Sequence, residues 1–512
     1  MSVTNSTVED TATRSATVGH GSSAEKPEPP ATKRPGGVRR IIEEEYILIV
    51  LLAGFGLIFL LIFPPAIIVN DSWLTLMVGR ELWENGLPSV DEVTVYGLGS
   101  TWTDQQWLAQ LTIFGAHSLG GLALVSILTA ASVVAAFSIA AAASRSLGAG
   151  ARAIWVMFLP VLLAAPWAWS VRAQVLALPL FTGLLWLLAA QARRPTNQVW
   201  IALALLVVWA NVHGSAALGA LLVMLLGAYE LVRSRGRSWL RSAGLLALAP
   251  LAILVTPYGP VDTARYYHLL LVDPPFAGRV TEWHWAEPAV NTMFFYALAA
   301  IAIPILVLGR RRLTLFDFAV LALSFVGAMT AIRGIVWFAL ACMVFVPVAI
   351  GKTLESRSPG EPRRSLNIGI SAVLAAALLA VAGSLFLRDE SWFEDYWPAE
   401  VPAAVRAELR PGDTVFAPDR FSDWLLWKIP ELRGRVAYDV RFELYDRAFF
   451  DRLAEYNGEA GDWKSFADGY RITLVDETRR SHTADFLKEP GARVVYRDDE
   501  ITILVRPGEA SG

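Results

Sequence analysis

The residue best placed to do chemistry is Asp71, which follows directly after the first hydrophobic run of the chain, Tyr46 to Val69. Asp71 opens a long polar, tryptophan-rich loop over residues 70–120. A carboxylate at the edge of an apolar run can accept a proton from a substrate beside a membrane. A carboxylate at a helix start also caps free backbone N–H groups, so for Asp71 taken alone both interpretations stand.

Further polar residues interrupt apolar runs later in the chain. Arg172 and Gln174 lie between two such runs, as do Asn211 with His213 and, further on, Arg333. Placing an arginine in a membrane span costs about 2.5–3.5 kcal/mol, so its presence indicates a partner or a function. Long side chains can also reach the interface and lower this cost. That alternative does not explain why these residues gather at turns on one predicted side of the membrane.

The loop over residues 257–290 adds Glu282 and His284, which alternate with tryptophans. Most aromatic residues here are typical of an interfacial belt, and the charged pair are the better site candidates. His213, His268 and His284 could approach Asp71 to hold a metal ion, but no pair has a ligand spacing such as His-Glu-x-x-His. From spacing alone the metal is unknown.

Composition places these residues in a polytopic helical membrane protein. The 512 residues are 54% hydrophobic and 18% charged, with 19 tryptophans and a mean hydropathy of +0.44. These values are typical of membrane proteins. The net charge of −3 gives no basic field for nucleic acid. The single cysteine, Cys342, excludes an intrachain disulfide and a thiolate metal site, and no phosphate loop, dinucleotide fingerprint or nucleophile elbow occurs in a supporting context.

The apolar runs predict about eleven transmembrane helices within residues 46–387. Residues 1–45 are rich in Ser, Thr, Pro and Ala and carry basic residues at Lys33, Arg34, Arg39 and Arg40, which predicts a disordered cytoplasmic tail. The first run lacks a small-residue cleavage site and is therefore a retained anchor. After it, at residues 46–69, we expect spans at 121–144, 153–170, 173–191, 198–212, 214–232, 242–256, 291–309, 314–331, 334–351 and 366–387.

Alternate loops are rich in arginine, which predicts their side as cytoplasmic. The chain is then a multi-pass protein of the plasma (inner) membrane with a cytoplasmic N-terminus. An odd number of spans places residues 388–512 outside the cell, on the same side as Asp71. Alternating strand and helix patterns there predict a small α/β domain. Asp439 and Asp476 end two of its expected strands, although such carboxylates are usually turn or helix caps.

The first outer loop also predicts a helix that rests in the membrane interface. Its apolar residues fall at helical spacing on one stripe, as in amphipathic surface helices. They are Trp73, Leu76, Met77, Leu82 and Trp83.

The whole layout resembles the GT-C superfamily of polytopic membrane glycosyltransferases. The resemblance rests on Asp71 opening a long first outer loop, on the many spans and on the terminal outer domain. More specific is the similarity to an uncharacterised bacterial group of such proteins. It is carried by Asp71-x-Trp73, Gly79-Arg80, Gly86-Leu-Pro88, Asp91, Gly97-x-x-x-Thr101-Trp102, Trp107-Leu108, Arg172-x-Gln174 and Asn211-x-His213-Gly214.

The resemblance implies a GT-C-like fold and transfer of a sugar from a polyprenyl-phosphate donor to an envelope glycan, lipid or protein. It makes Asp71 the catalytic base or a ligand of a divalent cation such as Mg²⁺ or Mn²⁺, with Asp91 or Asp104 as second carboxylates. We expect Arg172 and Arg333 to meet the phosphate charge.

The remaining candidates bind the donor phosphate or its sugar. They are Gln174, His213, Glu282 and His284. Flat apolar faces for the sugar ring or the prenyl chain are expected from Trp73, Trp102 and Trp285.

Two other classes stay open at the sequence level. A transporter or flippase of lipid-linked glycans would also need embedded arginines, although its charges should lie at mid-membrane and face both sides. An envelope-assembly scaffold would bind a partner through the outer domain and would tolerate loss of the Asp71 carboxylate.

Overall fold

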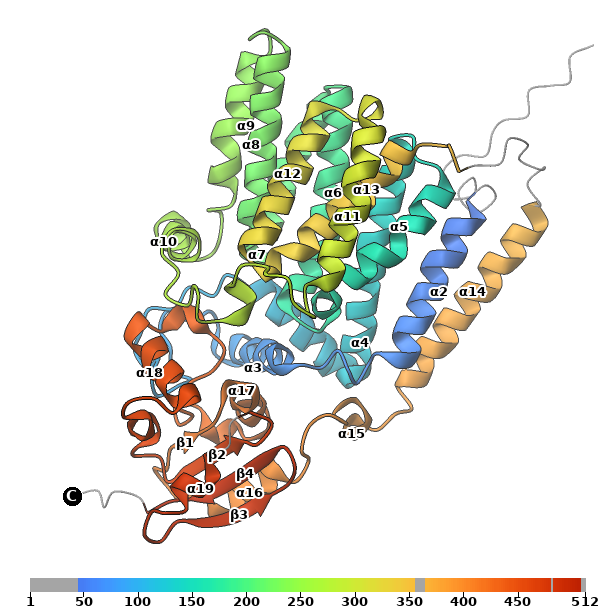
Figure 1. The fold of residues 1–512 in the computed structure, drawn as a ribbon. Helices are drawn as coiled ribbons and strands as arrows, with labels where there is room; N and C mark the ends of the chain where they lie inside the picture. The colour runs from blue at the N-terminus through green and yellow to red at the C-terminus, as the bar shows by residue number, and fades with distance from the viewer. Residues whose placement is uncertain (1–44, 355–363, 480–481, 508–512) are drawn as a thin grey trace, which may run out of the picture.

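The computed structural model describes residues 45–354, 364–479 and 482–507. An apolar helical bundle forms the larger part, and a small domain with one sheet lies at one end of it (Figure 1). The predicted N-terminal tail lies outside the described residues except for Glu45.

Each predicted span coincides with an apolar helix. By length and composition, five of the described helices can cross a membrane: residues 107–146, 173–193, 216–233, 332–350 and 364–385. The protein is therefore a helical membrane protein, and the count of eleven crossings stays a prediction. The apolar helices are α2 (Tyr46–Ile62), α4 (Trp107–Ser146), α5 (Ala151–Ala164), α6 (Ala173–Arg193), α7 (Ile201–Val212), α8 (Ala216–Arg233), α9 (Trp239–Ala252), α11 (Met293–Leu308), α12 (Leu315–Thr330), α13 (Ile335–Ile350) and α14 (Arg364–Leu385).

Two helices begin inside segments that the sequence predicted as loops. Helix α4 starts at Trp107 and bends at Gly120 and Gly121, where the backbone leaves helical geometry. Gly121 has a φ of +60°, which glycine adopts without strain. Only the part after this bend was predicted from hydrophobicity. Helix α10 (Gly259–Leu271) lies within the predicted outer loop 257–290.

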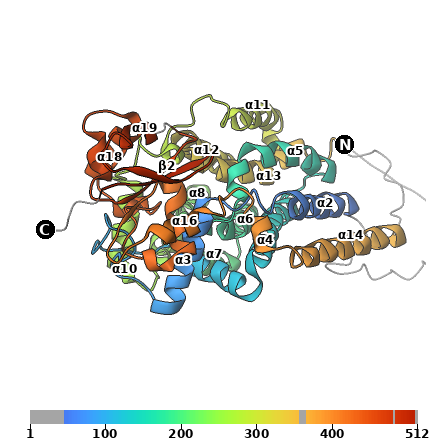
Figure 2. The ribbon, with the colours of Figure 1, turned by 90° about the horizontal axis from the view of Figure 1, so that it is seen from below.

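Burial distinguishes the central from the peripheral helices. Helix α13 is apolar on all sides and buried along almost its whole length, as expected for a helix at the centre of a bundle. Helix α14 is almost wholly exposed and packs along α2, as two views of the ribbon agree (Figures 1 and 2). Its apolar surface is therefore free to contact lipid.

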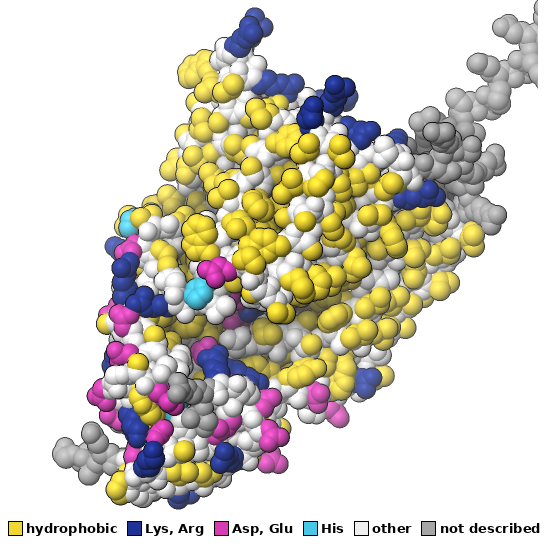
Figure 3. Space-filling model, viewed as in Figure 1, with side chains coloured by type: hydrophobic (Ala, Val, Ile, Leu, Met, Phe, Trp, Pro, Cys, Tyr) yellow, Lys and Arg dark blue, Asp and Glu magenta, His cyan; other side chains and the backbone are white. Residues whose placement is uncertain are grey.

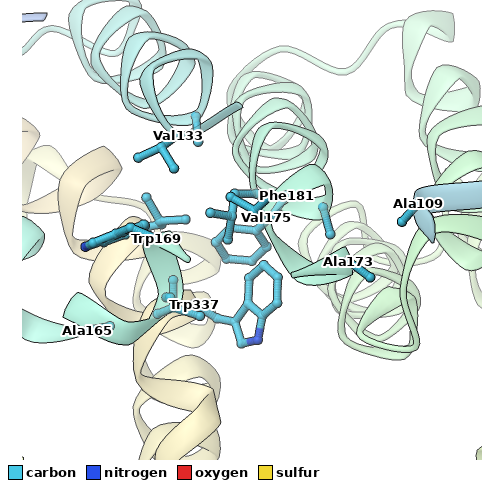
Figure 4. Close-up of a cluster of buried hydrophobic side chains, with 14 of the residues drawn as sticks. Ala109, Val133, Ala165, Trp169, Ala173, Val175, Phe181 and Trp337 are labelled. Carbon is cyan, nitrogen blue, oxygen red and sulfur yellow. The ribbon is translucent and has the colours of Figure 1, made fainter. Parts of the chain in front are cut away.

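The bundle core is aromatic where α6 meets α13. The rings of Phe181 and Trp337 lie 5.0 Å apart (Figure 4). Side chains of this kind bury large apolar areas and fix the spacing of neighbouring helices. On the molecular surface, apolar side chains cover the bundle, and Lys and Arg side chains gather at the end opposite the small domain (Figure 3). The run Arg310–Arg312 follows α11 in a loop that the sequence predicts as cytoplasmic.

The predicted interfacial helix is α3 (Asn70–Asn85), but it does not lie free on a membrane surface. It packs between α4 and α17 (Asp419–Lys428), a helix of the C-terminal domain (Figure 1). Four residues of the predicted stripe are buried, whereas Trp83 is 73% exposed. Because α3 is covered from two sides, Trp83 is the residue of the stripe that faces outward.

The C-terminal domain is built on a four-stranded mixed sheet of order β1-β2-β4-β3, in which β1 and β2 are parallel and the other neighbours antiparallel. Its elements follow the predicted alternation of strands and helices. They are α15 (Glu390–Phe393), α16 (Val401–Glu408), β1 (Val415–Phe416), α17, α18 (Arg447–Gly458), β2 (Ile472–Asp476), α19 (Thr483–Phe486), β3 (Arg493–Arg497) and β4 (Ile501–Val505).

The expected strand that ends at Asp439 is reduced to single bridges. Val436 bridges Val415 of β1 on one side and Thr94 of the first outer loop on the other. The backbone N–H groups of Val95 and Tyr96 donate to the carbonyl oxygens of Val436 and Ala437. The segment thus continues the sheet into the first outer loop, which ties the loop to the domain.

A buried ion-pair cluster completes this contact, which we call the loop–domain interface. Arg441, 2% exposed, contacts Asp91 of the loop at 2.8 Å and Asp439 of its own domain at 2.7 Å. Tyr445 donates to Asp439 at 3.1 Å and also contacts Thr94. Because both carboxylates and the guanidinium are withdrawn from water together, their charges are compensated locally.

Candidate active site

A cavity of about 1020 Å³ lies between the end of the helical bundle and the C-terminal domain. Its lining comes from α3, from the turns before α6 and α8, from the segment after α10, from the turn before α13 and from the C-terminal domain. The polar residues of distant turns therefore meet in one place, as their predicted position on one side of the membrane required.

Seven of the nine predicted site residues line this cavity. They are Asp71, Asp104, Arg172, Gln174, His213, Glu282 and Arg333. Asp91 and His284 are not part of the lining. Asp91 is completely buried in the loop–domain interface, and His284 is exposed on the protein surface.

Asp71 lies in the first turn of α3 and faces Arg172. Its carboxylate Oδ2 is 3.2 Å from the Arg172 Nε. The hydrogen bond that caps this helix start comes from another residue, because the backbone N–H of Val69 donates to the Ser72 Oγ at 2.9 Å. The side chain of Asp71 thus forms an ion pair with a guanidinium, without a hydrogen bond from its Nε, and 32% of the Asp71 side chain remains exposed.

Arg172 joins two carboxylates. Its Nη1 donates to the Glu282 Oε1 at 2.6 Å, while its Nε faces Asp71. Glu282 lies in the short 3₁₀ helix η3 (Thr281–Trp283), which brings the segment after α10 to the cavity. The three side chains form a line of alternating charge that connects α3 to this segment.

Burial and these neighbours shift the three pKa values. Burial raises the pKa of the Asp71 carboxyl, with opposing contributions from Arg172 and Glu282. Burial alone would also raise the pKa of Glu282, but Arg172 and Arg333 hold it below its ordinary value. For Arg172, the attraction of both carboxylates outweighs burial and raises the pKa, so the guanidinium is always charged.

Arg333 is the cavity arginine that forms no ion pair among the described residues. Its guanidinium lies 4.5 Å from the ring centre of Trp283, in a cation–π arrangement. The other lining arginines are engaged with carboxylates: Arg172 with Asp71 and Glu282, Arg279 with Asp451, Arg441 with Asp91 and Asp439, and Arg479 with Asp419. Arg333 is therefore the group best suited to receive an anion.

His213 ends α7 and is held in one neutral form. The backbone N–H of Ser215 donates to its Nδ1 at 3.1 Å, which leaves Nε2 to carry the proton. Burial, together with Arg333 and Arg172, lowers the pKa of His213 to about 3. His213 can therefore donate one hydrogen bond but adds no charge. Asn211 has a supporting role, since it accepts from Trp107 and donates to two backbone carbonyls.

Asp104 lies in a different part of the lining and is almost fully buried. The backbone N–H of Gln106 donates to it at 3.0 Å, and the Gln110 amide nitrogen, in the orientation that the carboxylate requires, donates at 2.6 Å. Burial raises the pKa of Asp104 to about 7, and the nearby charge of Glu443 adds to this increase.

The three tryptophans expected to offer apolar faces have different environments. Trp102 lines the cavity and stacks under Arg441, whereas Trp73 is buried against Trp397 and Trp285 is 66% exposed. The cavity tryptophan beside Glu282 is Trp283, which sequence reasoning did not single out.

The C-terminal domain contributes polar lining residues that the sequence did not predict as site residues. They are Asp419, Arg441, Glu443, Asn457 and Arg479. The two carboxylates considered there, Asp439 and Asp476, are paired with arginines and do not line the cavity. No spacing or run of residues distinguishes the five lining residues from ordinary surface charges, so only the docking of the domain reveals them.

The residues do not fit a divalent cation at Asp71. In the described part of the chain, no group of three or more His, Cys, Asp or Glu side chains gathers as metal ligands do. Asp71 and Glu282 are instead bridged by one guanidinium. A cation between the two carboxylates would therefore have to displace Arg172.

Comparisons with known proteins give a structural match. No protein-family model matches the chain, and no curated protein matches its sequence. ArnT from Cupriavidus metallidurans bound to undecaprenyl phosphate aligns with a TM-score of 0.51 at 16% identity, over 91% of this chain and 98% of that chain. The apo state of the same protein aligns with a TM-score of 0.51 at 16% identity, over 90% of this chain and 97% of that chain. The Archaeoglobus fulgidus oligosaccharyltransferase in the apo form gives 0.47 at 10% identity, over 84% of this chain and 69% of that chain.

The chain therefore shares the fold of ArnT over most of its length, as the resemblance to the GT-C superfamily implied. This confirms the architecture predicted from the sequence: a polytopic apolar bundle with a small terminal domain next to the loop that Asp71 opens.

Proposed function

We propose that this protein transfers a sugar from a polyprenyl-phosphate donor to a hydroxyl acceptor in the cavity. The observation that carries the proposal is the pairing of two groups in one cavity at the end of a membrane bundle. One is Asp71, a carboxylate oriented towards the cavity, and the other is Arg333, a guanidinium that forms no ion pair within the described part of the chain. The ArnT structure that shares this fold holds undecaprenyl phosphate.

The reaction is a single displacement with inversion. The acceptor oxygen attacks the anomeric carbon of the donor, and its proton passes to the Asp71 carboxylate. The bond between that carbon and the phosphate oxygen breaks, and polyprenyl phosphate leaves with the electron pair. Arg333 meets the negative charge of this leaving group through its planar guanidinium. His213, through its Nε2–H, and Gln174 are placed in the lining to bind phosphate or sugar oxygens.

The donor reaches the cavity from the bilayer and the acceptor from the side of the C-terminal domain. Apolar lining residues such as Leu218, Leu270 and Leu271 suit a prenyl chain, whereas the polar lining of the domain suits a hydrophilic acceptor. The acceptor is an envelope glycan, lipid or protein on the outer side of the plasma membrane, with the N-terminus in the cytoplasm. No step of this transfer passes through a divalent cation.

The proposal is tested by comparing the lipids and glycans of cells that lack the protein with cells that carry the wild type or D71N. We expect undecorated acceptor, or unspent polyprenyl-linked sugar, to accumulate equally in the deletion and D71N strains. E84Q is the matched control, because Glu84 is an exposed carboxylate on the same helix and is not part of the cavity lining. It should behave as wild type.

The opposite result is equally informative. If D71N restores the wild-type lipids and glycans while the deletion does not, the protein is a transporter or an assembly scaffold, and the transferase proposal is wrong.

A further inference from the structure

The row formed by Asp71, Arg172 and Glu282 contains more charged groups than a catalytic base needs. A base requires one carboxylate within reach of the acceptor hydroxyl. Here the carboxylate is followed by a guanidinium at 3.2 Å and by a second carboxylate 2.6 Å beyond it. The Arg172 side chain is only 17% exposed, and both of its charge partners come from other segments of the chain.

Arg172 is poorly placed to serve as the ligand of the donor phosphate. Its Nε and Nη1 already face carboxylates, whereas Arg333 lies on Trp283 and forms no ion pair with any residue that the structure describes. A phosphate approaching Arg172 would also approach the negative charges of Asp71 and Glu282. Like charges this close repel strongly in a partly buried site.

We propose that Arg172 is a positioning residue for Asp71, held in place by Glu282, and that Arg172 keeps the base ionised and oriented towards the cavity. This inference rests on the proposed function, because it assigns the base to Asp71. Arg172 thereby does at this site what a bridging metal ion does between two carboxylates elsewhere: it neutralises both and fixes their separation. Because Glu282 projects from the segment after α10, the orientation of Arg172 and Asp71 also depends on the position of that segment.

Charged groups on four neighbouring segments influence Asp71. Arg172 precedes α6, Glu282 lies in η3, and Arg333 lies in η5 (Ile332–Gly334); Asp419 and Asp423 lie in α17. The two arginines favour the ionised carboxylate and the three acidic residues oppose it. Removing one arginine must therefore raise the pKa of Asp71, and removing one acidic residue must lower it.

The test measures this protonation directly. Dicyclohexylcarbodiimide reacts with protonated carboxyl groups, so its labelling of Asp71 against pH, read by peptide mass spectrometry on the full-length protein in lipid nanodiscs, gives a midpoint without any donor. We expect R172Q to raise the midpoint by about one pH unit or more. R172K, which keeps the charge, should remain near the wild type. E282Q should lower the midpoint by about half a unit, because Arg172 is then left to Asp71 alone.

The control is E287Q, which removes an exposed carboxylate from the same loop and outside the cavity lining, and should leave the midpoint unchanged. A midpoint that does not move in R172Q, or that moves upward in E282Q, overturns the positioning role.

This outcome is separable from failure of the proposed function. If D71N keeps full activity in cells, the base assignment fails whatever the midpoints are. If D71N is inactive but the midpoints do not respond as expected, only the role of Arg172 and Glu282 fails. Because R172Q leaves two facing carboxylates, E282Q serves as the second variant should R172Q not fold.

Discussion

At the scale of residues, the site is a set of charges distinguished by their partners. Arg172 and Arg333 look alike in the sequence, since each is an arginine at a turn between apolar runs. In the structure two carboxylates form ion pairs with Arg172, whereas Arg333 lies over the ring of Trp283. Only the second keeps its charge available for an anion, so the two arginines should respond differently to substitution.

We expect R333A to weaken binding of undecaprenyl phosphate by about 10- to 100-fold, because a hydrogen bond to a charged group contributes about 1.5–3 kcal/mol. Calorimetry with undecaprenyl phosphate and the protein in nanodiscs would measure this change. Arg265 offers the control: it is 68% exposed on α10 and pairs with Asp262. Unchanged affinity in R333A, or an equal loss in R265A, would contradict the assignment of the phosphate to Arg333.

Asp104 makes stability depend on pH. Its pKa is raised from 3.8 to about 7 by burial, so the folded protein binds this proton more tightly than the unfolded chain. The contribution of Asp104 to stability is complete below pH 4 and is lost as pH rises towards 7. Thermal unfolding between pH 4 and 8 should show a smaller decrease in melting temperature for D104N than for the wild type. Parallel curves for the two proteins would show that Asp104 titrates normally.

At the scale of elements, the first outer loop and the C-terminal domain act as one unit. Helix α3 is packed between α4 and α17, and Val436 continues the sheet to Thr94 of the loop. Arg80 of α3 donates to the carbonyl oxygens of Leu426 and Trp427 at the end of α17. The orientation of Asp71 therefore depends on a domain that follows it by more than three hundred residues.

Arg441 is the side chain on which this contact depends most. R441A would leave Asp91 and Asp439 buried without a counter-charge, at a cost of about 3–5 kcal/mol. We expect faster proteolysis and hydrogen exchange in residues 88–104 and in the C-terminal domain.

The matched control is R433A at the same loop–domain interface. Arg433 pairs with Glu81 and Glu92, but its side chain is 40% exposed, so its loss should cost at most about 1 kcal/mol. Equal destabilisation of the two variants would mean that burial of the ion pair is not what holds the domain.

At the scale of the whole molecule, the bundle supplies the membrane end of the cavity and the C-terminal domain closes the other side. Lys and Arg side chains gather at the opposite end of the bundle (Figure 3). The orientation, with Asp71 and the C-terminal domain outside the cell, stays a prediction that rests on this asymmetry.

Orientation is testable with single cysteines in a C342A background, since Cys342 is completely buried. A membrane-impermeant maleimide added to intact cells should label D499C, in the exposed turn between β3 and β4, and should not label R237C, in the arginine-rich turn between α8 and α9. The reverse pattern would invert the topology and place the cavity in the cytoplasm.

The sequence by itself determined the class of the protein and most of the candidate site. Hydrophobic runs locate the apolar helices because each span must satisfy its own backbone hydrogen bonds in lipid. Polar residues at the ends of those runs identify Asp71, Arg172, His213, Glu282 and Arg333, because polar groups are costly near a bilayer and seldom occur there without a reason.

Only the tertiary structure decided which of these residues act on one another. That Glu282 and Asp71 share Arg172 depends on how three distant segments pack, and no local pattern encodes it. The same holds for Asp91, which a local pattern could not distinguish from a site carboxylate until Arg441 was placed beside it. The contribution of the C-terminal domain to the cavity lining could not be predicted either, since a charged residue that faces a cavity and one that faces water look the same in a sequence.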